Sequence, residues 1–124
     1  MVTQLENYIS EVEDDVIGWR RHLHEHPELS FKEFNTADYI YDILSNFEGL
    51  EISRPTQTSV MAVMKGKRPG RVLALRADID ALPIHELNDI SYKSREKGIM
   101  HACGHDGHTA MLLGTIKVLT ESKV

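Results

Sequence analysis

The sequence is short of cysteine, of positive charge and of long apolar runs, and each shortage excludes a class of protein. Its single cysteine, Cys103, cannot form an internal disulfide, which suits a reducing compartment. A net charge of −5 leaves no basic surface for nucleic acid. No apolar stretch approaches a membrane span, and no charged-then-apolar leader opens the chain. We therefore expect a cytoplasmic protein without nucleic-acid or membrane partners.

The composition that remains is that of an ordinary globular domain. Apolar residues make up 41% and charged residues 27% of the chain, and 124 residues fit one domain by length. An apolar stripe with alternating spacings of four and three residues predicts a first helix, which Pro27 ends. The stripe consists of Leu5, Ile9, Val12, Val16, Trp19 and Leu23.

The rest of the chain mixes helical and extended patterns. Apolar spacing predicts helices at about 32–46 and from about 106 to 121, and strands at 50–53, 60–65 and 71–77. Helices and strands mixed at this spacing predict an α/β fold, in which a layered mixed sheet is flanked by helices.

Residues 101–108 read His-Ala-Cys-Gly-His-Asp-Gly-His and concentrate side chains that bind transition metals or move protons. In an extended segment, residues two apart point the same way, so Cys103 and His105 could face one metal ion. A lone cysteine is usually an apolar filler, and histidines at a helix start are often just solvated. That explanation does not cover Cys103, His105, Asp106 and His108 together, so we predict a metal-binding or catalytic role.

Two aspartates form a second candidate site. Asp78 and Asp80 follow the apolar run 72–75, which is typical of a buried strand, and precede Pro83. Ligands of α/β sheets bind just past the carboxyl ends of strands. One carboxylate could therefore contact a metal ion, while the other hydrogen-bonds to a metal ligand and orients it.

Three histidines near the end of the first helix resemble a metal tract. His22, His24 and His26 are two residues apart, however, and such positions on a helix point to different sides. We therefore expect a structural or surface role for them.

Three segments together resemble a known family. They are 19–31 (Trp-Arg-Arg-His-Leu-His-Glu-His-Pro-Glu-Leu-Ser-Phe), 75–84 (Leu-Arg-Ala-Asp-Ile-Asp-Ala-Leu-Pro-Ile) and 98–114, which contains the Cys-His motif. The chain resembles, from about residue 15 to about residue 119, the aminoacylase-like metal-dependent amidohydrolases of the twentieth metallopeptidase family. This group includes hippurate hydrolases, N-acetyl-amino-acid deacetylases and auxin-conjugate hydrolases.

The resemblance implies a site with two divalent metal ions, zinc or manganese. Cys103 and His105 match family residues that ligate the metal ions. Asp80 matches an aspartate that acts beside them and that follows a metal-binding histidine by two positions in related peptidases. Asp78 takes the place of that histidine, so its role as a direct ligand stays open. His101, Asp106 and His108 match motif positions without being expected ligands.

The resemblance also implies that residues 1–124 are the N-terminal part of a catalytic domain. The dimerisation domain, the C-terminal half of the catalytic domain, a general-base glutamate and two further histidine ligands would then lie outside the chain. We expect a full-length homodimer that hydrolyses N-acyl amino acids or peptides, and a 124-residue chain that is inactive on its own.

Two alternatives remain open from the residues alone. Cys103 and a histidine could form a cysteine-nucleophile hydrolase, or the chain could be a non-catalytic fragment or binding module. Metal analysis separates the first alternative from a metal-dependent hydrolase, and turnover by the chain itself separates the second.

Overall fold

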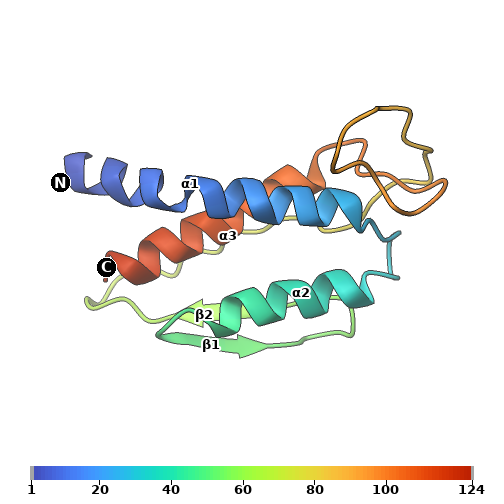
Figure 1. Ribbon diagram of the computed structural model, residues 1–124. Helices are drawn as coiled ribbons and strands as arrows, with labels where there is room; N and C mark the ends of the chain where they lie inside the picture. Colours follow the sequence, from blue (N-terminus) through green and yellow to red (C-terminus); the bar gives the residue numbers. More distant parts are fainter. Residues whose placement is uncertain (1, 124) are drawn as a thin grey trace.

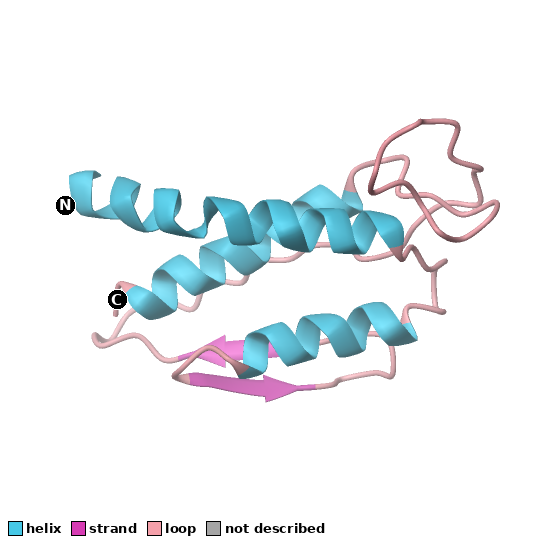
Figure 2. Ribbon diagram, viewed as in Figure 1, coloured by secondary structure: helices cyan, strands magenta, loops and turns pink. Residues whose placement is uncertain are grey.

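Three helices and one pair of strands form the regular structure of residues 2–123, which the computed structural model describes. In chain order they are α1 (Val2–Glu25), α2 (Phe34–Ser45), β1 (Leu50–Ser53), β2 (Met61–Met64) and α3 (His105–Glu121) (Figures 1 and 2). The predicted helices and the first two predicted strands are confirmed close to their expected ends. The α/β class is confirmed as well.

The elements are arranged in two layers. One layer consists of α1 and α3, which lie side by side, and the other consists of α2 and the pair of strands that it covers (Figure 1). The apolar core between the layers is built from Ile40 and Leu44 of α2 and Leu113 of α3. At its edge Trp19 of α1 packs on Phe47, with 6.2 Å between the ring centroids. Most of the apolar face of each helix is thus buried against another element, as the periodicity predicted, but Leu5 and Ile9 near the start of α1 are exposed.

The two strands pair in antiparallel register, with Leu50 opposite Met64 and Ser53 opposite Met61. Along β1 the side chains alternate between partly buried and exposed positions. Leu50 and Ile52 pack against the core, because side chains two apart on a strand point to the same face. The strand pair therefore has one face that α2 covers and one that is open to solvent.

The two long helices approach each other closely at Gly114 of α3. A β-carbon at this position would lie 2.5 Å from Cγ2 of Val16 on α1. A glycine inside a helix weakens it, so a helix interior normally avoids one. Here the absence of a side chain allows the backbone of α3 to pack closely against α1.

The third predicted strand, at 71–77, is wrong. This segment has no regular secondary structure and is drawn as loop in Figure 2. Val72, Leu73 and Leu75 are 99%, 81% and 53% exposed. An apolar run becomes a strand only where another strand accepts its backbone hydrogen bonds. Within residues 2–123 β1 and β2 pair only with each other, so the run has no such neighbour.

Backbone hydrogen bonds attach the connection between β2 and α3 to the segment at the C-terminal end of α1. Isolated bridges join Leu29 to Ala81 and Leu82 to Met100. The N–H of Arg95 also donates to the carbonyl oxygen of Glu25 at 2.9 Å. The C-terminal end of α1, the first turn of α3 and the loop between 80 and 104 therefore meet at one end of the molecule (Figure 1). Among residues 2–123, no helix is both long and apolar enough to cross a membrane.

Candidate functional site

His105, the first residue of α3, lies directly against Asp80. Its Nδ1 is 2.9 Å from Oδ1 of Asp80 and 3.0 Å from the backbone oxygen of the same residue. Both oxygens only accept hydrogen bonds, so Nδ1 carries the proton and donates it. In the neutral ring, Nε2 then has a free lone pair. A histidine that binds a metal ion through Nε2 uses this tautomer, with its other nitrogen on a carboxylate or carbonyl.

Asp80 is itself held from its other side. The hydroxyl of Ser30 donates to Oδ2 of Asp80 at 2.7 Å. This hydrogen bond is the main cause that lowers the pKa of Asp80. His105 lowers the pKa further, whereas burial opposes both effects. The carboxylate that orients His105 is therefore kept ionised.

Asp78 lies on the open side of the His105 ring. Its Oδ2 is 4.0 Å from Nε2 of His105, which is too far for a hydrogen bond. The carboxylate also pairs with Arg76, and the backbone oxygen of Asp78 accepts a 3.0 Å hydrogen bond from Thr109 of α3. Asp78, Asp80 and His105 therefore lie together, although the strand expected to deliver the aspartates does not form.

The chain bends at Cys103 and Gly104 instead of running extended, so that part of the sequence prediction is wrong. Gly104 has a φ of 121°, in the left-handed region that glycine adopts far more readily than other residues. The bend turns the chain directly into α3. Cys103, a free cysteine, is exposed at this corner.

His101 is buried, with 5% of its surface exposed. Neither ring nitrogen has a hydrogen-bond partner among the described residues. Burial is the main cause that lowers the pKa of His101 and favours the neutral ring. Buried polar atoms without partners are rare and costly. A further polar or metal partner in this region would fit these free nitrogens.

His24 does not converge with the other two histidines at the end of α1, as the helical spacing predicted, whereas the rings of His22 and His26, four positions apart, lie 4.5 Å from each other. The ring of His22 stacks on Tyr39, with 3.7 Å between the centroids, and His26 is exposed. His24 is buried and bonds to Asp106 of α3. Sequence reasoning missed this contact because the two residues are 82 positions apart. The burial of one histidine in a polar stretch of helix left no signal in the apolar stripe.

The described chain offers only part of a metal site. Within residues 2–123, no three histidine, cysteine, aspartate or glutamate side chains are placed so that they could hold one ion. The donor types nevertheless fit a divalent metal, because an oriented imidazole, an exposed thiol and carboxylates lie at one end of the fold.

Comparisons with known proteins give a family model and several relatives that match this chain. The model of peptidase family M20/M25/M40 matches residues 74–123. The chain is 58% identical over 118 residues to an N-acyl-L-amino acid amidohydrolase of Geobacillus stearothermophilus, a match that covers 95% of this chain and 32% of the relative.

Two solved structures share the fold. A proposed aminohydrolase from methicillin-resistant Staphylococcus aureus is 42% identical, with a TM-score of 0.92, over 99% of this chain and 33% of that one. The YXEP protein of Bacillus subtilis, described as a dinuclear metal binding peptidase from the M20 family, is 43% identical, with a TM-score of 0.82. That match covers 96% of this chain and 33% of YXEP.

The motifs, the fold and these matches together show that the chain is similar to hydrolases of the M20 family. The resemblance to the aminoacylase-like amidohydrolases, predicted from three sequence segments, is confirmed. The chain spans about a third of the length of the curated relatives it matches.

Proposed function

We propose that this chain forms part of the active site of a metal-dependent hydrolase that cleaves the amide bond of N-acyl amino acids. The observation that carries the proposal is the pair of His105 and Asp80, in which Nδ1 donates to a carboxylate and Nε2 is left free. The N-acyl-L-amino acid amidohydrolase of Geobacillus stearothermophilus supports this class of substrate. A peptide would present the same amide bond.

Cys103 and His105 would hold the metal ions, with Asp78 as a further candidate on the open side of the His105 ring. We expect two divalent ions because YXEP is described as dinuclear. Thiolate and imidazole suit zinc, and manganese is the alternative that the resemblance implies. Bound divalent ions supply Lewis acidity, which acidifies water and polarises an amide carbonyl.

The residues of this chain prepare the site for that chemistry. Asp80 keeps the proton of His105 on Nδ1 and fixes the orientation of the ring. Its negative charge also makes Nε2 a stronger electron-pair donor. Ser30 in turn fixes the carboxylate through its other oxygen.

The remaining parts of the site are proposed to lie in the two thirds of the relatives that this chain does not span. They would include the general-base glutamate and the further histidine ligands that the resemblance implies. We accordingly propose that the 124-residue chain alone binds metal weakly and has no activity. The full-length protein is proposed to be a cytoplasmic homodimer. Light scattering of the purified protein would test whether it is a dimer.

The test uses the full-length protein that the gene encodes, with N-acetyl and N-benzoyl amino acids as substrates. We expect turnover that a chelator abolishes and that Zn²⁺ or Mn²⁺ restores. Cys103→Ala should abolish turnover and lower the bound metal content. An alanine variant with full activity, or turnover that survives complete removal of metal, would contradict the proposal.

The same experiment separates this function from that of a cysteine nucleophile. A nucleophilic thiol needs a base within hydrogen-bonding distance, and among residues 2–123 no histidine forms a hydrogen bond with Cys103. A cysteine hydrolase would keep its activity after chelation and lose it on alkylation whether or not metal is present. For a metal-bound thiolate, Zn²⁺ should instead protect Cys103 from alkylation.

A further inference from the structure

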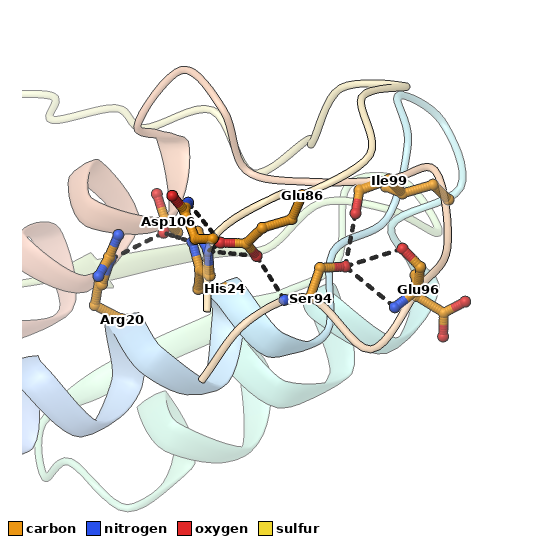
Figure 3. Close-up of polar contacts among 8 residues, drawn as sticks. Arg20, His24, Glu86, Ser94, Glu96, Ile99 and Asp106 are labelled. Carbon is orange, nitrogen blue, oxygen red and sulfur yellow. Dashed lines mark hydrogen bonds and ion pairs between the residues drawn. The ribbon is translucent and has the colours of Figure 1, made fainter. Parts of the chain in front are cut away.

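His24 of α1 bonds to two different carboxylates at once. Its Nδ1 is 2.8 Å from Oδ2 of Asp106, and its Nε2 is 3.0 Å from both oxygens of Glu86 (Figure 3). The side chain is buried, with 2% of the residue exposed. Because both carboxylates only accept, both ring nitrogens donate, and the arrangement uses the imidazolium form of His24.

The charges around His24 are balanced, by one partly exposed guanidinium and the buried ring and carboxylates. The Nε of Arg20 donates to the same Oδ2 of Asp106 at 3.0 Å, so two cations face two carboxylates. The guanidinium of Arg20 also lies over the ring of Tyr92, 5.2 Å from its centroid. Removal of one partner from such a group leaves a buried charge without compensation, which is strongly unfavourable.

Glu86 extends this contact into the loop that leads to the site. Its Oε1 accepts from the backbone N–H of Ser94 at 2.6 Å, and its Oε2 accepts from Asn88 at 2.9 Å. The hydroxyl of Ser94 in turn donates to the backbone oxygen of Ile99 at 2.6 Å (Figure 3). The loop from 86 to 99 is therefore organised around the carboxylate that His24 holds.

Asp106 extends the contact into the site itself. It follows His105 directly in the first turn of α3, where the helix dipole favours a negative charge. It is buried and points toward α1, whereas the ring of His105 faces Asp80. Fixing Asp106 therefore fixes the turn from which the His105 ring extends.

We propose that His24 is a positioning residue, which joins α1 to the first turn of α3 and to the 86–99 loop and thereby holds His105 in place against Asp80. The inference rests on the proposed function, because it concerns the metal affinity of that same site. Neither His24 nor its two carboxylates would touch the metal or the substrate.

The test compares three variants of the full-length protein. His24→Phe keeps a ring but removes both donors and leaves two carboxylates facing one cation. His24→Phe/Glu86→Gln removes one carboxylate as well, so that the charges balance again. His26→Phe is the matched control, because His26 is exposed and lies one residue past the end of α1. Zn²⁺ affinity is measured by competition with a chromophoric chelator, kcat and KM with an N-acetyl amino acid, and folding by circular dichroism.

We expect His24→Phe to be folded. Its metal affinity and its kcat should fall by about 10- to 100-fold, which is the usual loss when a residue that orients a metal ligand is removed. KM should change much less, since substrate is not contacted. The double variant should recover part of the metal affinity, and His26→Phe should match wild type. If His24→Phe does not fold, His24→Gln, which keeps one donor, is measured in the same way.

Two results would overturn the inference, and they are distinguishable. A folded His24 variant with the metal affinity and kcat of the control would show that His24 does not position the site, while the proposed function stands. A wild-type protein that neither binds metal nor hydrolyses any N-acyl amino acid would refute the proposed function, and this inference with it. Equal metal affinity in the single and double variants would also count against the charge-balanced arrangement.

Discussion

Asp80 is the residue whose role can be tested most directly, because its two carboxylate oxygens have separate partners. One accepts from His105 and the other from Ser30. Asp80→Asn removes the charge while keeping the size of the side chain. We expect it to lower kcat/KM or metal affinity of the full-length protein by about 10- to 100-fold, the usual effect of losing a carboxylate behind a histidine ligand.

The comparison for this variant is Asp89→Asn, a change of the same kind at an exposed aspartate in the neighbouring loop. It should leave both kinetics and metal affinity unchanged. Thermal unfolding of both variants should stay close to wild type, since Asp80 is not part of the apolar core. Wild-type kinetics in Asp80→Asn would remove Asp80 from the site.

The lowered pKa of Glu86 predicts how the free energy of unfolding depends on pH. Burial alone raises the pKa of its carboxyl, but hydrogen bonds from His24, Ser94 and Asn88 outweigh burial and lower the pKa from 4.5 to about 2. The unfolded chain therefore binds this proton more readily than the folded one. The stabilisation, of the order of a few kcal/mol, is present above pH 4.5 and is lost as the pH falls toward 2.

The measurement is the free energy of unfolding from pH 7 to pH 2, in wild type and in Glu86→Gln. The variant should be less stable at neutral pH, because His24 loses its charged partner. Its stability should also fall less steeply below pH 4.5. Parallel pH profiles for the two proteins would mean that Glu86 has no depressed pKa.

Residue types and short spacings predicted part of the candidate site. Asp80 was expected to orient a ligand, and the structure places it on His105, 25 positions away. The roles of Cys103, His105 and Asp78 as metal ligands remain predictions. The contact of His24 with Glu86 and Asp106 could not be predicted, because it depends on how α1, α3 and the loop pack together.

Among the elements, the contact of α1 with α3 at Gly114 gives the sharpest prediction. Gly114→Ala would place a methyl group 2.5 Å from Cγ2 of Val16. The branched side chain of Val16 has little freedom to turn away inside a helix. We expect the overlap to exceed the gain in helix propensity and to lower the free energy of unfolding by about 1–3 kcal/mol, as measured by urea denaturation.

Two further variants show whether the contact between Gly114 and Val16 causes the loss of stability. Gly18→Ala changes a glycine of α1 with nothing within 4 Å of the added carbon, and should raise stability by about 0.5–1 kcal/mol. Val16→Ala in the Gly114→Ala background removes the colliding methyl groups and should restore part of the loss. A stabilising effect of Gly114→Ala would mean that the helices are further apart.

The helices were predictable because each carries its own apolar periodicity, which needs no knowledge of the neighbours. The same holds for the pair β1 and β2, which are close in sequence and complete each other's hydrogen bonds. The segment 71–77 has the composition of a buried strand but no partner strand among residues 2–123. A strand is a property of a pair, so the residues of one segment cannot guarantee it.

At the scale of the whole molecule, the unpaired segment 71–77 is a run of exposed apolar side chains among the described residues. Val72, the most exposed of its side chains, is almost fully open to solvent, and Leu73 is nearly so. Residues 71–77 also have backbone groups that no strand of the described chain pairs with. Exposed apolar segments with free backbone hydrogen-bonding groups are sites of association.

We therefore expect the 124-residue chain, purified on its own, to associate with itself through this segment. Val72→Lys/Leu73→Lys should lower the mean mass measured by light scattering, because two like charges then face each other at any contact between copies. The matched control is Leu5→Lys/Ile9→Lys, which adds the same charge at two exposed apolar positions of α1. The control should associate as the unmodified chain does. If both double variants lower the mass equally, net charge and not the 71–77 segment governs association, and a monomeric unmodified chain would contradict the prediction outright.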